Sequence, residues 1–453
     1  MLSPEENELV TRTGAGTSMG AVMRRYWMPA ALAWELPQPD CPPIRIKLLG
    51  EKLVAFRDTE GRVGLIDEFC AHRRASLFLG RNEEGGLRCV YHGWKYDTKG
   101  TCLDMPNEPA ETNFKHAVRL KAYPTAEVGG VIWAYMGPAE KVPPLPKFEW
   151  TQVPQNYRHL SKMRQECNWL QALEGAIDNA HAGFLHRALT DKTTRAGLRG
   201  YWENSQAPRL DVHITDYGFM YTATRALPER ENYVRAYQYV MPFHQFFPSQ
   251  IAHSGSAAKL KKPTVRGHMF VPMDDENSMV YNWTYTFADQ PLTEADSEQL
   301  GRHIGSAPEE LTADFRKVRN KDNDWLIDRQ VQKTETYTGI EGITTQDHAI
   351  QESMGPIVDR SRERLGSTDK AIVAARRLLL QTAKTVLEGG DPPGIDTSYY
   401  SIRAVERVLP DGVDCLEALK AEVNPVNRRE ATVSNRSFSQ SVTAVATGEP
   451  HRL

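Results

Sequence analysis

The sequence has few cysteines, no long apolar run and no basic run. Six cysteines among 453 residues are too few and too scattered for a disulfide scaffold, so we expect Cys41, Cys102, Cys167 and Cys415 to be ordinary reduced thiols. Cys70 and Cys89 differ, because each has a histidine two or three residues downstream. No apolar stretch reaches the roughly 18 residues that span a bilayer, and the opening residues, MLSPEENELV, lack the blocks of a secretory signal. A formal net charge of −3 without a cluster of Lys or Arg argues against nucleic acid. We therefore expect a cytoplasmic protein with neither a membrane nor a nucleic-acid partner.

The length and the local patterns indicate two domains. A chain of 453 residues exceeds one ordinary hydrophobic core. LVAF (53–56) and VGLI (63–66) flank the turn DTEG (58–61), which is typical of a β-hairpin. The apolar run GGVIWAYMGP (129–138) extends this all-β region. The Pro-rich segment KVPPLPKF (141–148) then indicates a domain linker.

Beyond this linker the pattern is mixed. Residues 168–186 have helical character, whereas segments between 209 and 286 alternate like the strands of a sizeable antiparallel sheet. KAIVAARRLLLQTAKTVLEG (370–389) predicts an amphipathic helix that ends at Gly389 and Gly390. We expect an α+β chain in four parts: a helix and lead-in over 1–40, an all-β domain over 41–140, a second domain over 141–425, and a polar tail over 426–453.

Two short Cys/His pairs stand out in the all-β region. Cys70-Ala71-His72 and Cys89-Val90-Tyr91-His92 are separated by sixteen residues. On two neighbouring loops of a small β-domain, these pairs can bring four ligands to one metal centre. A structural zinc site would also use two thiolates and two imidazoles, so the pairs alone leave zinc open.

The wider pattern resembles the Rieske [2Fe–2S] domain. The short Cys-x-His spacing lies in a strand-rich region, and Gly93-Trp94-Lys95-Tyr96 follows the second pair. The resemblance implies that Cys70 and Cys89 hold one iron, and that His72 and His92 hold the other. Imidazole ligands raise the reduction potential, so such a cluster accepts electrons from a ferredoxin-like donor.

A second candidate metal site lies in the helical stretch that follows the linker. Asp178, His181 and His186 occur together there, and two imidazoles with one carboxylate form the facial triad of non-haem Fe(II) oxygenases. Five residues on a regular α-helix separate the two histidines by about 140°. They can share a metal only if the helix is bulged or broken between them, and Gly183 lies in that interval. Taken alone, such a pair more often reflects packing than ligation.

The local sequence also carries a resemblance. The Asp-x-x-His-x-x-x-x-His motif within CNWLQALEGAIDNAHAGFLH (167–186) resembles the α subunits of Rieske non-haem iron ring-hydroxylating oxygenases, in their phthalate dioxygenase branch. The resemblance implies a helix-grip-like catalytic domain with a large antiparallel sheet and flanking helices. It also implies that His181, His186 and a distant aspartate hold mononuclear Fe(II). Asp347 is the best match, and Asp359 and Glu352 are weaker candidates.

Asp178 has a separate role in that family. The resemblance implies that it hydrogen-bonds His181 and also His92 of a neighbouring subunit. An outer-shell carboxylate orients a histidine ligand and makes it more basic. The active unit would then be a homotrimer or a homohexamer, in which electrons cross from one chain to the next.

The resemblance further implies an oxygenase component that hydroxylates, by cis-dihydroxylation, an aromatic carboxylate such as phthalate. The sequence lacks a nucleotide-binding glycine fingerprint, so electrons would come from a separate NAD(P)H-dependent flavin and iron–sulfur reductase. A buried carboxylate needs a charged partner, and we expect Arg199 and Arg235 to supply it. Arg225 and Arg195 are further candidates for binding the anion. Phe184, Phe243 and Phe246 could line a ring pocket, and ordinary core packing explains them equally well.

Three alternatives remain at this stage. A Rieske monooxygenase or O-demethylase shares the same ligands. An electron-transfer Rieske protein without oxygenase activity would hold one iron centre only. A zinc-stapled binding module would hold no iron, so a metal count separates these classes.

Overall fold

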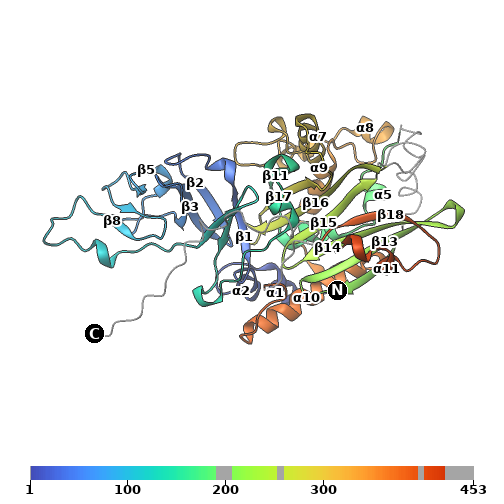
Figure 1. The fold of residues 1–453 in the computed structure, drawn as a ribbon, viewed down its shortest axis with the longest axis horizontal. Coiled ribbons are helices and arrows are strands. Elements are labelled where there is room, and N and C mark those ends of the chain that lie inside the picture. The colour runs from blue at the N-terminus through green and yellow to red at the C-terminus, as the bar shows by residue number, and fades with distance from the viewer. Residues whose placement is uncertain (1, 190–206, 252–259, 396–401, 424–453) are drawn as a thin grey trace.

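The computed structural model describes residues 2–189, 207–251, 260–395 and 402–423 (Figure 1). The expected α+β class is confirmed. A front domain of short strands (residues 27–135) lies beside a larger second domain (residues 149–423) along the longest axis of the molecule (Figure 1). None of the described helices is long and apolar enough to cross a membrane.

The front domain consists of three small antiparallel sheets, in the strand orders β1-β10-β9, β2-β3-β4 and β5-β6-β7-β8. The predicted hairpin is confirmed, because β3 and β4 pair with Phe56 opposite Gly64. A Cβ on Gly64 would lie 2.7 Å from the Phe56 ring, so glycine permits this close pairing. The strands are β1 (Trp27–Leu32), β2 (Ile44–Leu48), β3 (Glu51–Arg57), β4 (Val63–Asp67), β5 (Arg81–Glu83), β6 (Gly86–Arg88), β7 (Lys95–Tyr96), β8 (Cys102–Asp104), β9 (Thr125–Val128) and β10 (Val131–Tyr135).

The second domain is built on one eight-stranded antiparallel sheet, as the alternating segments predicted. Its order is β11-β17-β16-β15-β14-β13-β12, and β18 also pairs with β14. The strands are β11 (Arg158–Gln165), β12 (Arg209–Ile214), β13 (Gly218–Leu227), β14 (Glu231–Val240), β15 (His244–Ile251), β16 (Leu260–Pro272), β17 (Ser278–Thr286) and β18 (Val405–Pro410).

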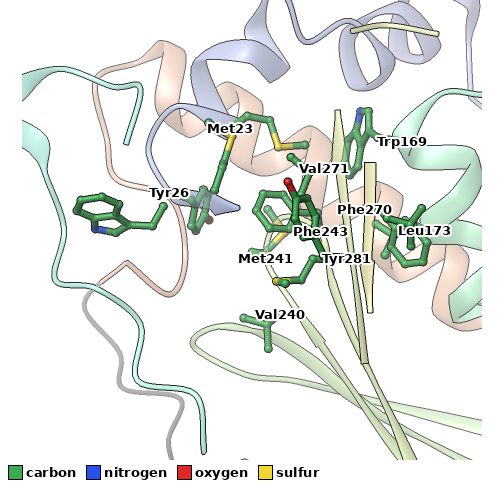
Figure 2. Packing of buried hydrophobic residues seen from close by; sticks show 14 of the residues in the cluster. Met23, Tyr26, Trp169, Leu173, Val240, Met241, Phe243, Phe270, Val271 and Tyr281 are labelled. Carbon is green, nitrogen blue, oxygen red and sulfur yellow. The ribbon is translucent and has the colours of Figure 1, made fainter. Parts of the chain in front are cut away.

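Helices pack on this sheet and around its ends (Figure 1). They are α1 (Pro4–Thr11), α2 (Ser18–Met23), α3 (Glu149–Gln152), α4 (Trp169–Ile177), α5 (Ala182–Leu185), α7 (Glu294–Ile304), α8 (Arg329–Thr334), α9 (Ile343–Ser353), α10 (Lys370–Leu387) and α11 (Cys415–Val423). The core lies between α4 and the sheet, where Figure 2 shows Trp169 and Leu173 beside Phe270 and Val271. The apolar face of α4 is therefore held against β16.

The first helices join the second domain rather than the front one. Helices α1 and α2 pack against α10, although more than 300 residues separate them in the sequence (Figure 1). The predicted helix α10 is confirmed, and Gly389 ends it with a φ of 87°. No disulfide joins any of the six cysteines, all of which lie in the described residues. The polar tail predicted over 426–453 lies outside the described residues.

Candidate metal centres and the cavity between them and the sheet

The two Cys/His pairs lie on adjacent loops of the front domain. Cys70 follows β4 and Cys89 follows β6, and each loop is closed by a backbone hydrogen bond to the cysteine carbonyl, from the amides of Arg74 (2.9 Å) and Gly93 (3.0 Å). The rings of His72 and His92 lie 4.4 Å apart, centre to centre. All four predicted ligands line one small pocket.

The polar atoms at this pocket fit an iron–sulfur cluster. The Nδ1 atoms of His72 and His92 are buried and have no hydrogen-bond partner within the described parts of the chain. Burial raises the pKa of the Cys70 thiol, so its thiolate form requires a nearby cation. Tyr96 Oη lies 3.2 Å from Cys70 Sγ, which places a hydrogen-bond donor beside this ligand sulfur. A cluster with two sulfur and two imidazole ligands would satisfy these atoms.

The helix predicted over 168–186 is not continuous. It divides into α4 and the single turn α5, and Asp178 ends α4 with an extended ψ of 129°. His181 precedes α5 and His186 follows it, so the break lies before His181 and not at Gly183. The expectation of a break between the histidines was wrong in position. The histidines converge because α5 unwinds at His186, which has φ −97° and ψ 16°.

Side chains from the sheet stabilise this break. Tyr221 donates to the carbonyl of Ile177 (2.9 Å), and Arg225 donates to the carbonyl of Asn179 (2.8 Å). Asn179 also hydrogen-bonds Tyr237. Carbonyl groups that a continuous helix would satisfy internally thus find partners on β13. Arg225 was a further candidate for anion binding. It holds the segment around Asn179 instead, and it does not line the cavity beside the metal site that is described below.

His181, His186 and Asp347 meet at one point. Asp347 Oδ1 lies 3.5 Å from His181 Nε2 and 3.3 Å from His186 Nε2, and the three possible ligand atoms lie within 4.8 Å of one another. Helix α9 carries Asp347, and it approaches α4 closely at Gly175, where a Cβ would lie 1.9 Å from the Gln351 amide nitrogen. Asp347 Oδ1 is buried with no hydrogen-bond partner among the described residues. A divalent cation held by two imidazoles and one carboxylate would satisfy it.

The other ring nitrogen of each histidine is oriented by a neighbour. His181 Nδ1 lies 3.4 Å from Asp178 Oδ2, and His186 Nδ1 lies 2.8 Å from Gln346 Oε1. Because Gln346 Nε2 donates to the Ile340 carbonyl (2.8 Å), Gln346 Oε1 must accept from His186. When each histidine gives up its second proton to bind a metal, the remaining proton would lie on Nδ1 and the Nε2 lone pair would face Asp347. The sequence interpretation missed Gln346, although it immediately precedes Asp347.

Charge at this site favours ionised carboxylates. Burial acts to raise the pKa of Asp347, but His186 and His181 outweigh it, and the net pKa lies below the usual value. Burial is likewise outweighed at Asp178, where the hydrogen bond and charge of His181 lower the pKa. Both carboxylates are therefore anionic at neutral pH, as a metal ligand and its outer-shell partner must be.

A cavity of about 310 Å³ lies between the triad of His181, His186 and Asp347 and the large sheet. Its sheet wall includes cross-strand pairs of β16 and β17, in which Arg266 faces Thr284 and His268 faces Asn282. Phe184, Phe243 and Phe246 do not line this cavity: Phe184 is 42% exposed, and the other two are buried in the core. The aromatic rings that do line it are those of Tyr237, Phe247, Phe270 and Trp283.

Comparisons with known proteins show the family of the chain. The model for the Rieske [2Fe-2S] domain matches residues 26–124, and the model described as LigXa C-terminal domain like matches residues 134–434. The chain is 38% identical over 429 residues to the phthalate 4,5-dioxygenase oxygenase subunit of Pseudomonas putida, covering 92% of each chain. The chain belongs to the Rieske oxygenase family.

A further relative supports this membership, and a solved structure shares the fold. The 3-chlorobenzoate-3,4-dioxygenase oxygenase subunit of Comamonas testosteroni is 38% identical over 443 residues, which cover 94% of this chain and 100% of the relative. The solved structure of Pseudomonas putida CBB5 NdmA with caffeine has a TM-score of 0.58 at 19% identity, and the match covers 82% of this chain and 94% of that one. The predicted family is confirmed, and so are its two cofactors, a Rieske cluster and a mononuclear iron.

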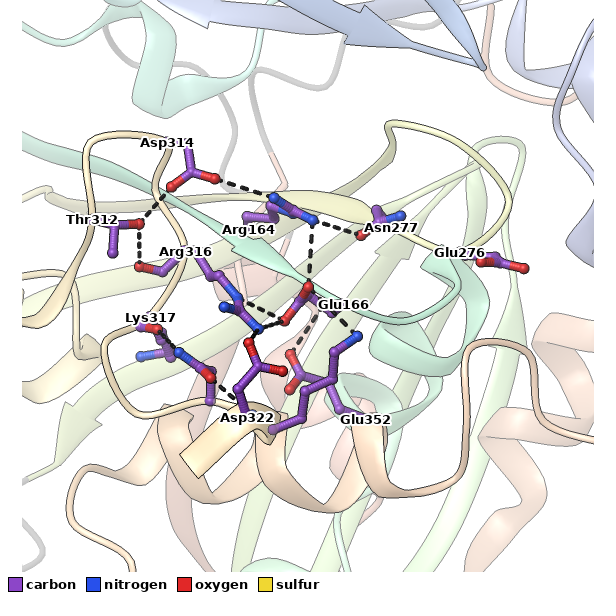
Figure 3. A network of polar contacts seen from close by, with 12 residues as sticks. Arg164, Glu166, Glu276, Asn277, Thr312, Asp314, Arg316, Lys317, Asp322 and Glu352 are labelled. Atoms are coloured by element: carbon purple, nitrogen blue, oxygen red, sulfur yellow. Dashed lines mark hydrogen bonds and ion pairs between the residues drawn. The ribbon is translucent and has the colours of Figure 1, made fainter. Parts of the chain in front are cut away.

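The structure also places the weaker candidates of this Rieske oxygenase. Glu352 accepts hydrogen bonds from the Glu166 amide (3.0 Å) and from Trp325 Nε1 (3.2 Å), within the polar network of Figure 3, and it does not line the cavity. Asp359 caps a short turn by accepting from Ser361 (3.0 Å). Neither residue joins His181 and His186. Both carboxylates already accept hydrogen bonds from backbone amides or nearby side chains, so neither is available as a metal ligand.

The predicted anion-binding arginines have different outcomes. Arg235 lines the cavity, but its guanidinium donates to the Pro248 carbonyl (3.0 Å) and lies 3.3 Å from Glu406, which balances its charge. Arg199 and Arg195 lie outside the described residues.

Proposed function

We propose that this Rieske oxygenase is the oxygenase component that hydroxylates an aromatic carboxylate such as phthalate, by cis-dihydroxylation. The observation that carries the proposal is the convergence of His181, His186 and Asp347 on a cavity in a chain that also contains a Rieske domain. Two relatives of 38% identity are named for phthalate and for 3-chlorobenzoate, and both are benzene rings with carboxylate groups. A cavity of about 310 Å³ lies at the small end of the range for ligand pockets, which suits one substituted ring.

We assign the ligands of the two centres from the same geometry. Cys70, Cys89, His72 and His92 would hold the [2Fe–2S] cluster, and their unpartnered buried nitrogens support this assignment. The triad would hold Fe(II), which supplies open coordination positions for O2 beside the substrate ring. The protein's own contribution is to keep the ring at the triad and to exclude water, and the buried walls of the cavity serve that purpose.

Electron transfer in this proposal crosses between subunits. Figure 1 shows strands β5 and β8 of the front domain at one end of the molecule and α5 toward the other end, so the two centres of one chain are poorly placed for transfer. Asp178 contacts His181 and is 25% exposed at its side chain, which leaves it accessible to a second chain. We propose that His92 of a neighbouring copy contacts Asp178 in a homotrimer or homohexamer. A separate flavin and iron–sulfur reductase, which uses NAD(P)H, would reduce the cluster.

Turnover with isotopic oxygen tests the reaction class. The holoenzyme would be supplied with a phthalate-type reductase, NADH and ¹⁸O₂, with phthalate and 3-chlorobenzoate as trial substrates. We expect a cis-diol that contains two ¹⁸O atoms. A product with a single ¹⁸O, or a demethylated product from a methoxybenzoate, would instead identify a monooxygenase or O-demethylase. Failure to oxidise any aromatic acid with both iron centres loaded would reject the proposed function.

A further inference from the structure

Arg266 is a half-buried arginine of the second domain, and its ion pairing differs from that of the buried Arg360 and Arg235. It lies on β16, where it pairs with Phe247 of β15 and with Thr284 of β17, and it lines the cavity that also contains the triad. Its Nε is buried and has no acceptor, and Arg266 makes no ion pair or hydrogen bond with any described side chain. By contrast, buried Arg360 is bound by Glu174 at 2.9 Å, and Arg235 lies 3.3 Å from Glu406.

An uncompensated guanidinium is costly inside a protein. Moving a charge out of water destabilises the fold unless an opposite charge or several hydrogen bonds accompany it. Burial lowers the pKa of Arg266, and the nearby charge of Arg235 lowers it further, although Glu406 and Tyr237 act in the opposite direction. The protein alone therefore leaves this charge incompletely balanced, which suggests that an anionic ligand completes the balance.

The residue opposite Arg266 supplies a second donor. Thr284 is fully buried, lines the same cavity, and its hydroxyl has no hydrogen-bond partner in the described chain. The two residues are direct cross-strand neighbours, so their side chains leave the same face of the sheet. A carboxylate accepts hydrogen bonds through both oxygens, and a guanidinium with an adjacent hydroxyl matches that need.

The strand that carries Arg266 also carries His268. His268 lies two residues further along β16 and accordingly on the same face, where it contacts Asn282 at 2.6 Å. Arg266, His268 and the three residues of the triad all line the same cavity. A ligand in this cavity can therefore contact both the arginine and the metal site.

We infer that Arg266 and Thr284 form the carboxylate-binding subsite for the aromatic acid. The inference rests on the proposed function and specifies which residues recognise the acid group of the substrate. The carboxylate would accept hydrogen bonds from the guanidinium and the threonine hydroxyl, while the ring extends past His268 toward His181 and His186. Residues of the sheet would thus bind the acid group, and the metal triad carried by the helical segments would oxidise the ring.

Binding of a charged and a neutral ligand to the holoenzyme tests the subsite. Anaerobic calorimetry would compare 3-chlorobenzoate with its uncharged analogue 3-chlorobenzamide. We expect Arg266→Met to weaken 3-chlorobenzoate binding by about 10- to 100-fold, as loss of a hydrogen bond to a charged group does, and to leave 3-chlorobenzamide within about threefold. Thr284→Val should show a smaller loss of the same selectivity. Arg209→Met, at an arginine with a side chain 67% exposed, is the control and should change neither ligand.

Stability separates recognition from a structural role. Without ligand, Arg266→Met should unfold at the same temperature as the wild type or higher, because it removes an unbalanced charge. Arg235→Met should unfold at a lower temperature, because it leaves Glu406 buried without its nearest cation. A fall in the melting temperature for Arg266→Met like that of Arg235→Met would overturn the inference.

The outcomes also distinguish a wrong carboxylate subsite from a wrong proposed function. If the wild type oxidises the acid but Arg266→Met weakens acid and amide equally, or neither, the subsite is refuted and the proposed function stands. If the loaded wild type neither binds nor oxidises any aromatic acid, both are refuted.

Discussion

Replacement of Gln346 by leucine should weaken the mononuclear iron site without changing any ligand. Gln346 is 7% exposed. Among the described residues, its Oε1 is the only acceptor for the hydrogen bond that His186 Nδ1 donates. Leucine has a similar volume but no acceptor, so the Nδ1 proton of His186 would remain buried and unpartnered. The Ile340 carbonyl would lose its donor as well.

Two estimates of the magnitude agree. Leaving a buried donor without an acceptor costs about 1–3 kcal/mol. Loss of an outer-shell partner of a metal-bound histidine typically weakens metal binding by about 10- to 100-fold, which corresponds to about 1.4–2.7 kcal/mol. We therefore expect Gln346→Leu to release Fe(II) at a chelator concentration about 10- to 100-fold lower than the wild type does.

The assay is a competition between the protein and a calibrated Fe(II) chelator. The electron paramagnetic resonance signal of the reduced cluster, recorded in parallel, verifies that the front domain is intact. Gln346→Glu retains an acceptor for His186 and should keep most of the affinity. Gln381→Leu, on the exposed face of α10, is the matched control. An unchanged iron affinity in a folded Gln346→Leu protein would refute the orienting role of this hydrogen bond.

Three further predictions concern the electron path, the cluster and the helix that carries the site. Asp178→Asn should retain both iron centres but slow the single-turnover rate by at least about tenfold, and an unchanged rate would exclude a role in transfer. Tyr96→Phe removes a hydrogen bond to a ligand sulfur, so a redox titration should show a potential lower by about 40 mV, the equivalent of about 1 kcal/mol, and an unchanged potential would contradict this. Glu174→Gln removes the anion that lies between Arg360 and Arg376, and urea unfolding should show a loss of about 3–5 kcal/mol, with a loss under about 1 kcal/mol as the contrary result.

Local signals in the sequence were sufficient for the front domain. The turn residues between LVAF and VGLI specify a hairpin through neighbours only, and the β3–β4 pairing follows. The same is true of α10, whose apolar periodicity and terminal glycines lie within one segment. The short spacing of each Cys/His pair, together with its strand-rich context, made these residues the predicted cluster ligands.

The break before His181 depends on distant residues and was misplaced for that reason. Tyr221 and Arg225, more than 40 residues downstream, satisfy the carbonyls of Ile177 and Asn179. No residue within 168–186 indicates that these distant side chains are its partners. The local sequence therefore indicated Gly183 as the position of the break, and tertiary hydrogen bonds place it before His181 instead.

The residues of the cavity were missed because strand register decides them. Phe246 was one of three candidates for a ring pocket or for ordinary core packing. It packs in the core, and its neighbour Phe247 lines the cavity, since successive residues of a strand point to opposite faces. Likewise, Arg235 cannot be distinguished from Arg266 by sequence, because the partner that balances Arg235 is Glu406, 171 residues away.

Metal analysis of the purified, fully loaded protein shows whether one chain holds two different iron centres. We expect about three irons per chain, two in the mixed Cys/His cluster and one at the triad. We also expect His181→Ala to retain about two irons with an unchanged cluster spectrum. Zinc in place of iron, or an iron count that His181→Ala does not reduce, would contradict the presence of two iron centres.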